Sequence, residues 1–191
     1  MGVLEYLSES ESLLAATREH PSVLRVENAV EVITQALASG RPLLVCGNGG
    51  SAADAMHISG ELVGRFHRER RGFKCICLVT DPAFLTAWAN DYSYDSVFAR
   101  QIEAYGHEGG VLLGLSTSGN SANVVRAFEA ARLAGMSTIA FTGAGGGKLA
   151  SLADVLVDVP SRSTPLIQQV HSCLYHYLCA EVEERLADQP A

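Results

Sequence analysis

The hydrophobic pattern of this chain changes its period near residue 41. Over residues 1–40, apolar side chains recur every three or four positions, which predicts two amphipathic helices. Gly40 follows the second of them, as glycine often does just past a helix end. Beyond this point the chain contains short, continuously apolar runs, which are typical of buried strands in a parallel sheet. The predicted strands cover 42–46, 74–80, 110–115, 137–142 and 155–159.

Helical patterns separate these apolar runs, at 52–65, 83–89, 94–105, 122–133 and 165–186. Strands that alternate with helices predict right-handed crossovers and an α/β fold. We therefore expect a three-layer α/β/α sandwich around a mainly parallel, five-stranded sheet. We find no repeat or linker, so residues 1–191 are predicted to form one domain. Its parts would be N-terminal helices at 1–40 and a core at 41–191 that ends in a long helix.

The composition excludes several classes of protein. Apolar residues make up 48% of the chain and charged residues 18%, which argues against intrinsic disorder. The net charge of −7, without a long basic run, argues against a nucleic-acid partner. One cationic cluster is interpreted as a solvated helix end and loop; it comprises Arg65, His67, Arg68, Arg70 and Arg71.

The cysteines and the apolar stretches bear on the compartment. The chain has five cysteines, an odd number, without Cys-x-x-Cys spacing, which argues against a disulfide framework and against a cysteine-based zinc site. We expect neither a signal peptide within residues 1–18 nor a membrane-spanning stretch, so the predicted compartment is the cytoplasm.

Three loops that follow predicted strands are candidates for ligand binding, because open parallel sheets bind ligands beyond the carboxyl ends of their strands. The first is 47–51, where glycines and a helix start suit an anion. Ser51 and Asp54 also fit a capping box, which would give Ser51 a purely structural role. The loop further fits a Gly-x-Gly-x-x-Ala dinucleotide fingerprint, with Asp81 as the ribose-binding acid, but the rest of the chain points elsewhere.

The second loop, 116–121, has four hydroxyls in six positions and is predicted to hold a phosphate. The alternative is a polar turn with a helix N-cap from Asn120 or Ser121. The third loop, 143–148, imitates a P-loop, but its glycines are too closely spaced and Leu149 replaces the Ser or Thr that would bind magnesium. We interpret it as a flexible turn and reject nucleotide hydrolysis.

Two predicted helices carry groups for chemistry. His57 and Glu61 lie four residues apart, on one helix face, where they can share a metal, act as an acid/base pair or form a structural pair. On the last helix, Gln168 and His176 project to similar sides, since eight residues make a little over two turns. His171 is interpreted as a core histidine with satisfied hydrogen bonds.

Together these motifs resemble the phosphoheptose isomerases, which are sugar isomerase (SIS) domain proteins. The resemblance runs from about residue 40 to 185. The His-x-x-x-Glu and Gln-x7-His patterns narrow it from SIS domains in general to this family. The matching segments are GNGGSAADAMHISGELVGRF at 47–66, LSTSGNSANV at 115–124 and TPLIQQVHSCLYH at 164–176.

The resemblance implies conversion of D-sedoheptulose 7-phosphate to D-glycero-D-manno-heptose 7-phosphate, the first step towards activated heptose for lipopolysaccharide and related glycans. It implies a homotetramer with active sites between subunits and one zinc ion (Zn2+) per subunit. The implied zinc ligands are His57, Glu61, Gln168 and His176, and the implied acid/base pair is Glu61 and His176. The implied substrate contacts are Asn48, Gly49, Ser51, Glu61, Asn90, Asp91, Ser116, Thr117, Ser118, Ser121 and Gln168.

The chain departs from the family pattern at two positions, and two alternative functions remain open. Pro165 occupies the position of an Asp in some relatives, and Gln169 that of a frequent Glu, so roles of those acids are not transferred. One alternative is an isomerase of another sugar phosphate. The other is a non-enzymatic SIS protein that binds the bacterial replication initiator, but that paralogue lacks the acid and the histidine found here as Glu61 and His176.

Overall fold

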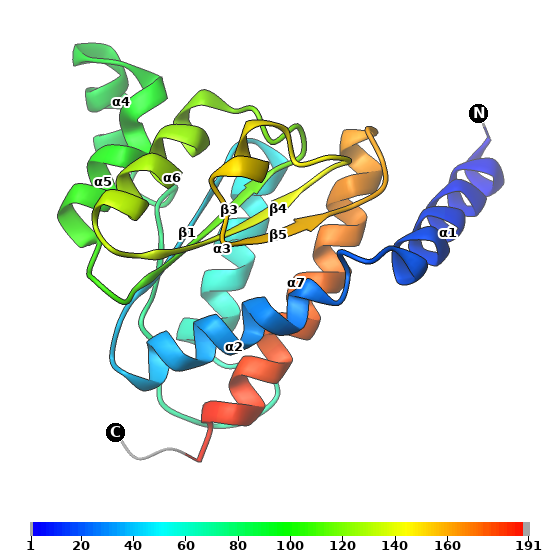
Figure 1. Cartoon of the computed structure of the whole chain (residues 1–191), viewed down its shortest axis with the longest axis horizontal. Coiled ribbons are helices and arrows are strands. Elements are labelled where there is room, and N and C mark those ends of the chain that lie inside the picture. The colour runs from blue at the N-terminus through cyan, green and yellow to red at the C-terminus, as the bar shows by residue number, and fades with distance from the viewer. Residues whose placement is uncertain (1, 189–191) are drawn as a thin grey trace.

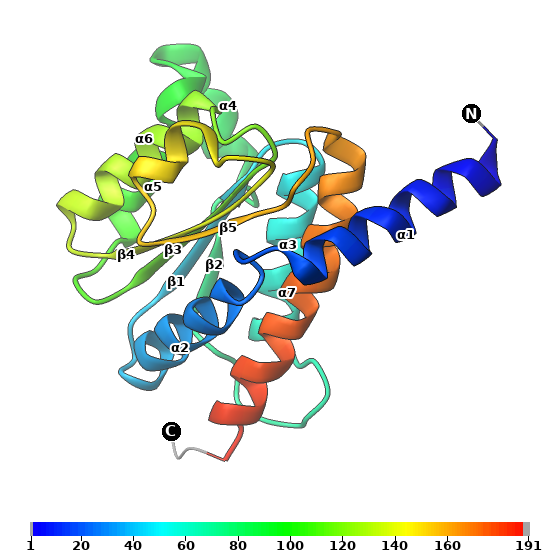
Figure 2. The same ribbon diagram turned by 45° about the vertical axis from the view of Figure 1, so that its right-hand side comes forward.

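The computed structural model, which describes residues 2–188, contains a five-stranded sheet in the order β2-β1-β3-β4-β5. Every neighbouring pair of strands is parallel. Helices cover both faces of the sheet (Figures 1 and 2), so the predicted three-layer α/β/α architecture is confirmed. The strands are β1 (Leu43–Gly47), β2 (Cys75–Cys77), β3 (Val111–Ser116), β4 (Ser137–Thr142) and β5 (Val155–Asp158).

The helices divide between the two faces of the sheet. The core on one face is formed by α2, α3 and α7, and the core on the other by α5 and α6, with α4 packed at its margin. Two 3-10 turns, Tyr94–Ser96 and Gly147–Ser151, complete the fold. The helices are α1 (Val3–Glu19), α2 (Arg25–Ala38), α3 (Gly50–Val63), α4 (Pro82–Asp91), α5 (Val97–Tyr105), α6 (Ala122–Leu133) and α7 (Thr164–Leu186).

The apolar runs that predicted strands are continuous because both faces of the sheet are covered. In β1, Leu43 and Val45 belong to the core beneath α2, α3 and α7, whereas Leu44 and Cys46 belong to the opposite core. All five residues of β1 and all six of β3 are buried. Such burial on both sides is the usual property of parallel strands between two helical layers.

Some predicted elements differ in length from the observed ones. Only residues 75–77 of the predicted strand 74–80 pair with β1, because the chain then turns into α4. Asp81 caps that helix by accepting a hydrogen bond from the backbone N–H of Phe84, so its side chain has a structural role. The predicted helix 94–105 is divided into the 3-10 turn and α5.

Helix α1 forms as predicted. Leu13, near its end, packs against Ile167 and Val170 of α7, but within residues 2–188 the apolar side chains of its first turns are exposed. The helix projects away from the body of the molecule (Figures 1 and 2). Leu4 is 77% exposed and Leu7 57%. Among the described residues, no helix combines the length and the apolar character needed to cross a bilayer.

A buried carboxylate fastens the loop after α3 to α7. The Glu183 carboxylate accepts hydrogen bonds from the backbone N–H groups of Phe66, His67 and Arg68, at 2.8, 2.6 and 2.9 Å. Nε of Arg70 donates to the same carboxylate at 3.0 Å, and the two side chains are 0% and 2% exposed. The interpretation of 65–71 as a solvated cationic loop is therefore wrong for Arg70, which folds inward because Glu183 offers it a partner.

Arg70 also ends α3. Its guanidinium donates to the backbone carbonyls of Glu61, Leu62 and Gly64, which lie at the helix C-terminus where carbonyls lack intrahelical partners. For Glu183, burial disfavours the charged form, but the three amide donors and Arg70 outweigh it and hold the pKa below the ordinary value of 4.5. The carboxylate is therefore ionised and fully paired near neutral pH.

We predict that Glu183→Gln lowers the free energy of unfolding by about 3–5 kcal/mol, because the buried Arg70 loses its charge partner. Urea denaturation at pH 7 measures the change, with Glu184→Gln as the matched control. Glu184 is 70% exposed in its surface pair with Arg68, so the control should lose at most about 1 kcal/mol.

The pH dependence checks the cause of this effect. A depressed pKa stabilises the fold above the ordinary value of 4.5, and the stabilisation disappears as the pH falls through the folded-state pKa. The difference in the free energy of unfolding between wild type and Glu183→Gln should therefore become smaller below pH 4.5. A difference that stays constant down to pH 3 would contradict an ionic role for Glu183.

Candidate active site between two parallel helices

Two of the predicted loops meet at the carboxyl edge of the sheet. Strands β1 and β3 are neighbours, so the loops 47–51 and 116–121 that follow them lie side by side. Both lead into helix N-termini, whose free N–H groups suit an anion. They enclose a cavity of about 280 Å³ that the start of α7 completes. Its lining residues are Asn48, Gly49, Gly50, Ser51, Leu115, Ser116, Thr117, Ser121, Thr164 and Gln168.

The glycines of the first loop are required by its geometry. Gly49 has a φ of 57°, which glycine adopts without strain, and it is the N-cap of α3. A Cβ atom at Gly47 would lie 2.5 Å from the backbone oxygen of Ser51. Because α3 starts at Gly50, the capping-box interpretation of Ser51 and Asp54 is wrong. Ser51 lies inside the first turn instead, 3% exposed, with its Oγ 3.5 Å from Nε2 of Gln168.

The hydroxyls of the second loop are held by one another and by α7. Ser116 and Ser121 share a hydrogen bond at 3.0 Å between their Oγ atoms. Thr117 and Thr164 share one at 3.2 Å between their Oγ1 atoms. Ser121 is the N-cap of α6, but its side chain bonds Ser116 rather than the helix. These four hydroxyl residues line the cavity and are held in place by hydrogen bonds with one another.

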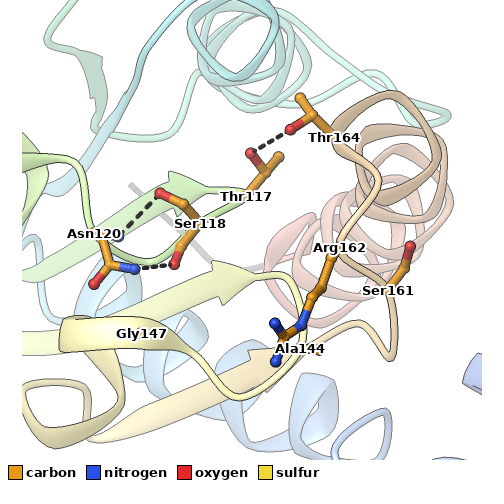
Figure 3. Close-up of a pocket in the computed structure, with 8 residues that line it drawn as sticks. All are labelled: Thr117, Ser118, Asn120, Ala144, Gly147, Ser161, Arg162 and Thr164. Atoms are coloured by element: carbon orange, nitrogen blue, oxygen red, sulfur yellow. Dashed lines mark hydrogen bonds between the residues drawn. The ribbon is translucent and has the colours of Figure 1, made fainter.

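A second cavity, of about 370 Å³, adjoins the first, and Thr117 and Thr164 line both. Figure 3 shows Thr117 and Ser118 on one side of it and the 161–164 segment on the other. The third predicted loop contributes Ala144 and Gly147 to its lining. That loop runs into a 3-10 turn that is bonded to the second loop, since the Lys148 N–H donates to Oδ1 of Asn120.

Asn48 is fixed by two residues that the sequence did not single out. Its Oδ1 accepts hydrogen bonds from the hydroxyl of Tyr94 and from Nδ2 of Asn123, both at 2.9 Å. Asn90 and Asp91 are placed differently. They are exposed at the end of α4, where Asn90 donates to Asp91, and α4 lies across the molecule from α7 (Figure 1).

Helices α3 and α7 lie side by side and bring together three of the predicted metal ligands. Nε2 of His57 lies 3.0 Å from Oε1 of Glu61 and 3.4 Å from Nε2 of His176. One ligand atom from each of the three residues lies within 4.8 Å of the others. Gln168, the fourth predicted ligand, contacts Ser51 instead. It lies eight residues before His176, which is about 12 Å along the helix axis.

The three side chains suit zinc by donor type and by spacing. Two ligands of a tetrahedral zinc ion, each about 2.0–2.1 Å from the metal, lie about 3.3 Å from one another. The distances of 3.0 and 3.4 Å from Nε2 of His57 are close to that value. The side chains of His57 and Glu61 are 45% and 22% exposed, so the cluster is open on one side in a single chain.

Comparison with known proteins decides the family. The SIS domain model matches residues 5–143. The phosphoheptose isomerase of Rhodospirillum rubrum is 50% identical over 161 residues, 84% of this chain and 86% of the relative. The phosphoheptose isomerase of Aliarcobacter butzleri is 44% identical over 97% of both chains. The solved phosphoheptose isomerase structure from Neisseria gonorrhoeae superposes with a TM-score of 0.90 at 40% identity, covering 95% of this chain and 97% of that one.

This chain belongs to the phosphoheptose isomerase family of SIS domain proteins. The family resemblance predicted from the three motifs is therefore confirmed. The individual roles of the site residues stay predictions, supported by the positions described above.

His171, by contrast, belongs to the core of this family member. It is 0% exposed, and its Nε2 donates to the backbone carbonyl of Thr142 at 3.1 Å. Its Nδ1 finds no partner within residues 2–188, so the predicted histidine is buried but only half satisfied. Burial lowers the pKa of His171 to about 4, which keeps the ring neutral and outside the proton chemistry.

We predict that the purified protein binds zinc through the cluster with one ion per chain. His57→Ala and His176→Ala should each lose most of this zinc, because three ligands are needed for a stable site. Elemental analysis after dialysis measures the metal, with His107→Ala as the control, since His107 lies beside Arg41 outside the cluster. Equal zinc in all four proteins would contradict the site.

Proposed function

We propose that this protein interconverts D-sedoheptulose 7-phosphate and D-glycero-D-manno-heptose 7-phosphate. One observation carries the proposal. Glu61 on α3 and His176 on α7 meet through His57, and the starts of the same two helices line the hydroxyl-lined cavity. An acid and a base beside a phosphate-type cavity suit an aldose–ketose isomerisation of a sugar phosphate, and the curated relatives carry the name of that activity.

The phosphate end of the substrate would bind in the two adjoining cavities. The hydroxyls of Ser51, Ser116, Thr117 and Ser121 line the cavity, and Ser118 lines the adjoining one. Hydroxyls and the free N–H groups at the starts of α3 and α6 can hold a phosphate without a lysine. Because the phosphate is remote from the reacting carbons, its binding energy serves to position them.

The isomerisation needs one proton moved between C1 and C2 and another between their oxygens, through a cis-enediol. Oε1 of Glu61 faces His57, so Oε2 is the atom available to move the carbon proton. His176, from the same cluster, would move the proton between the two oxygens. Each positioned transfer contributes about 10²–10⁴-fold to the rate.

We also propose that His57, Glu61 and His176 hold a zinc ion, with Gln168 completing the set by a side-chain rearrangement. Held by these residues, the ion would supply Lewis-acid stabilisation of the negative charge that develops on the enediol oxygens. His57 then serves as a ligand only, whereas Glu61 and His176 also face the substrate. Asn48, Gly49, Asn90 and Asp91 stay the proposed contacts to the sugar chain.

We predict that Glu61→Gln lowers kcat for sedoheptulose 7-phosphate by about 10²–10⁴-fold, since an amide cannot accept the carbon proton. A coupled or chromatographic assay of the aldose product measures it. The control is Glu103→Gln, a surface carboxylate on α5 paired with Arg100, which should keep wild-type activity. A folded Glu61→Gln variant with the wild-type rate would exclude Glu61 as the base.

The same assay separates the rival functions. Comparing sedoheptulose, fructose and arabinose phosphates tests whether another sugar phosphate is the better substrate. Absence of isomerisation with all three, together with capture of the replication initiator in a pull-down, would favour the non-enzymatic alternative.

We propose that the active unit is a homotetramer. The projecting α1 with its exposed Leu4 and Leu7 and the open metal cluster both suggest that other copies of the chain cover these surfaces. Asn90 and Asp91 would then reach the site of a neighbouring subunit.

The proposed compartment is the cytoplasm, in keeping with five free cysteine thiols. The proposed pathway leads to activated heptose for lipopolysaccharide or related glycans.

We predict that the double variant Leu4→Lys, Leu7→Lys lowers the molecular mass in solution, because charged side chains cannot be buried between helices. Light scattering coupled to size-exclusion chromatography measures it. Leu133→Lys on α6, where Leu133 is 91% exposed, is the control and should leave the wild-type mass unchanged. A tetramer in the double variant would show that α1 does not hold the assembly together.

A further inference from the structure

A hydrogen-bonded chain lies behind His57, on the side away from Glu61. The Tyr175 hydroxyl lies 3.1 Å from Nδ1 of His57 and 3.4 Å from Oδ1 of Asp54. Tyr175 is 2% exposed and packs edge-on against the imidazole, with ring centroids 5.4 Å apart. Asp54 precedes His57 by three residues on α3, whereas Tyr175 comes from α7. These hydrogen bonds therefore join the two helices.

The available protons determine which group donates in each hydrogen bond between Asp54, Tyr175 and His57. An ionised carboxylate only accepts hydrogen bonds, and a tyrosine hydroxyl has a single proton to donate. Oδ2 of Asp54 has no hydrogen-bond partner within residues 2–188, so Tyr175 is the donor that the structure offers to this half-buried carboxylate. The hydroxyl proton therefore goes to Asp54, and the phenolic oxygen accepts from Nδ1–H of His57.

The direction of the chain determines which nitrogen of His57 faces the cluster as a ligand. With the proton on Nδ1, the neutral imidazole has its lone pair on Nε2, the atom that lies 3.0 Å from Glu61 and 3.4 Å from His176. A ring nitrogen binds metal only through its lone pair, and the hydrogen bond of the other nitrogen selects it.

We propose that Tyr175, held by Asp54, is a positioning residue that fixes the ring and the tautomer of His57 for metal binding. This inference rests on the metal site of the proposed function. Tyr175 does not contact the substrate in this account. It acts through His57, in the way that carboxylates and carbonyls behind zinc-bound histidines raise metal affinity in other proteins.

Tyr175→Phe tests the proposal, because it removes one oxygen and keeps the buried ring. The readout is the dissociation constant for zinc, from competition with a chromophoric chelator at pH 7. The loss of a partner behind a metal-bound histidine should weaken zinc binding about 10-fold or more. The matched control is Tyr177→Phe, which removes a hydroxyl from the same helix where it contacts Glu27, and its zinc affinity should equal the wild type.

Asp54→Ala is the second variant, in case Tyr175→Phe fails to fold. Without the carboxylate, the Tyr175 hydroxyl is free to donate to Nδ1 of His57, which favours the wrong tautomer, so zinc binding should again weaken. A merely structural role for either residue would lower the melting temperature of the metal-free protein and leave the zinc dissociation constant unchanged.

The outcomes for this proposal and for the function are distinct. Unchanged zinc affinity in both folded variants, or a wild-type protein that binds no zinc, overturns the role of Tyr175. Isomerase activity of the wild type, assayed on the same preparation, tests the function independently, since a zinc affinity that depends on Tyr175 is measured without substrate.

Discussion

The parallel packing of α3 against α7 is the constraint on which the site depends. Contacts at three levels fix how the helices are aligned. Gln168 meets Ser51 near the two helix starts, His176 meets His57 in the middle, and Glu183 holds the loop that follows α3. A change in the alignment of one turn would separate the cluster, because its side chains come from both helices. The parallel sheet makes this arrangement possible, since both helices begin at its carboxyl edge.

The interaction at the far end of the pair provides specificity as well as stability. Buried ion pairs often stabilise a fold no more than apolar residues of similar size, since desolvation offsets the attraction. Here, however, the carboxylate of Glu183 accepts from three backbone amides, and Arg70 donates to three backbone carbonyls at the end of α3 besides Glu183. These directional bonds admit one relative placement of the loop and the two helices.

The sequence allowed the fold and much of the site to be predicted, for a physical reason. Doubly buried strands require continuous apolar runs, and a phosphate-type loop requires small residues and hydroxyls at a strand end, so both leave local patterns. His57 and Glu61 were likewise predictable, because four-residue spacing places them on one helix face.

What the sequence could not reveal depends on contacts between distant segments. Arg70 looks like its charged neighbours Arg68 and Arg71, and only Glu183, 113 residues away, distinguishes it. Tyr175 reads as an apolar core residue, because its hydroxyl gains partners only when α7 meets α3. Ser51 and Asp54 match a capping box, yet α3 begins one residue before Ser51, because Gly49 adopts a positive φ and is the N-cap. A local sequence pattern does not show such contacts or backbone conformations.

The most direct test of the central claim is anomalous diffraction at the zinc edge from crystals that contain sedoheptulose 7-phosphate. The account predicts one metal peak per chain between His57, Glu61 and His176, with the sugar phosphate bound by the hydroxyls around Ser51 and Thr117. Metal bound elsewhere, or a phosphate group outside the hydroxyl-lined cavities while Glu61 is turned away from the sugar, would contradict it.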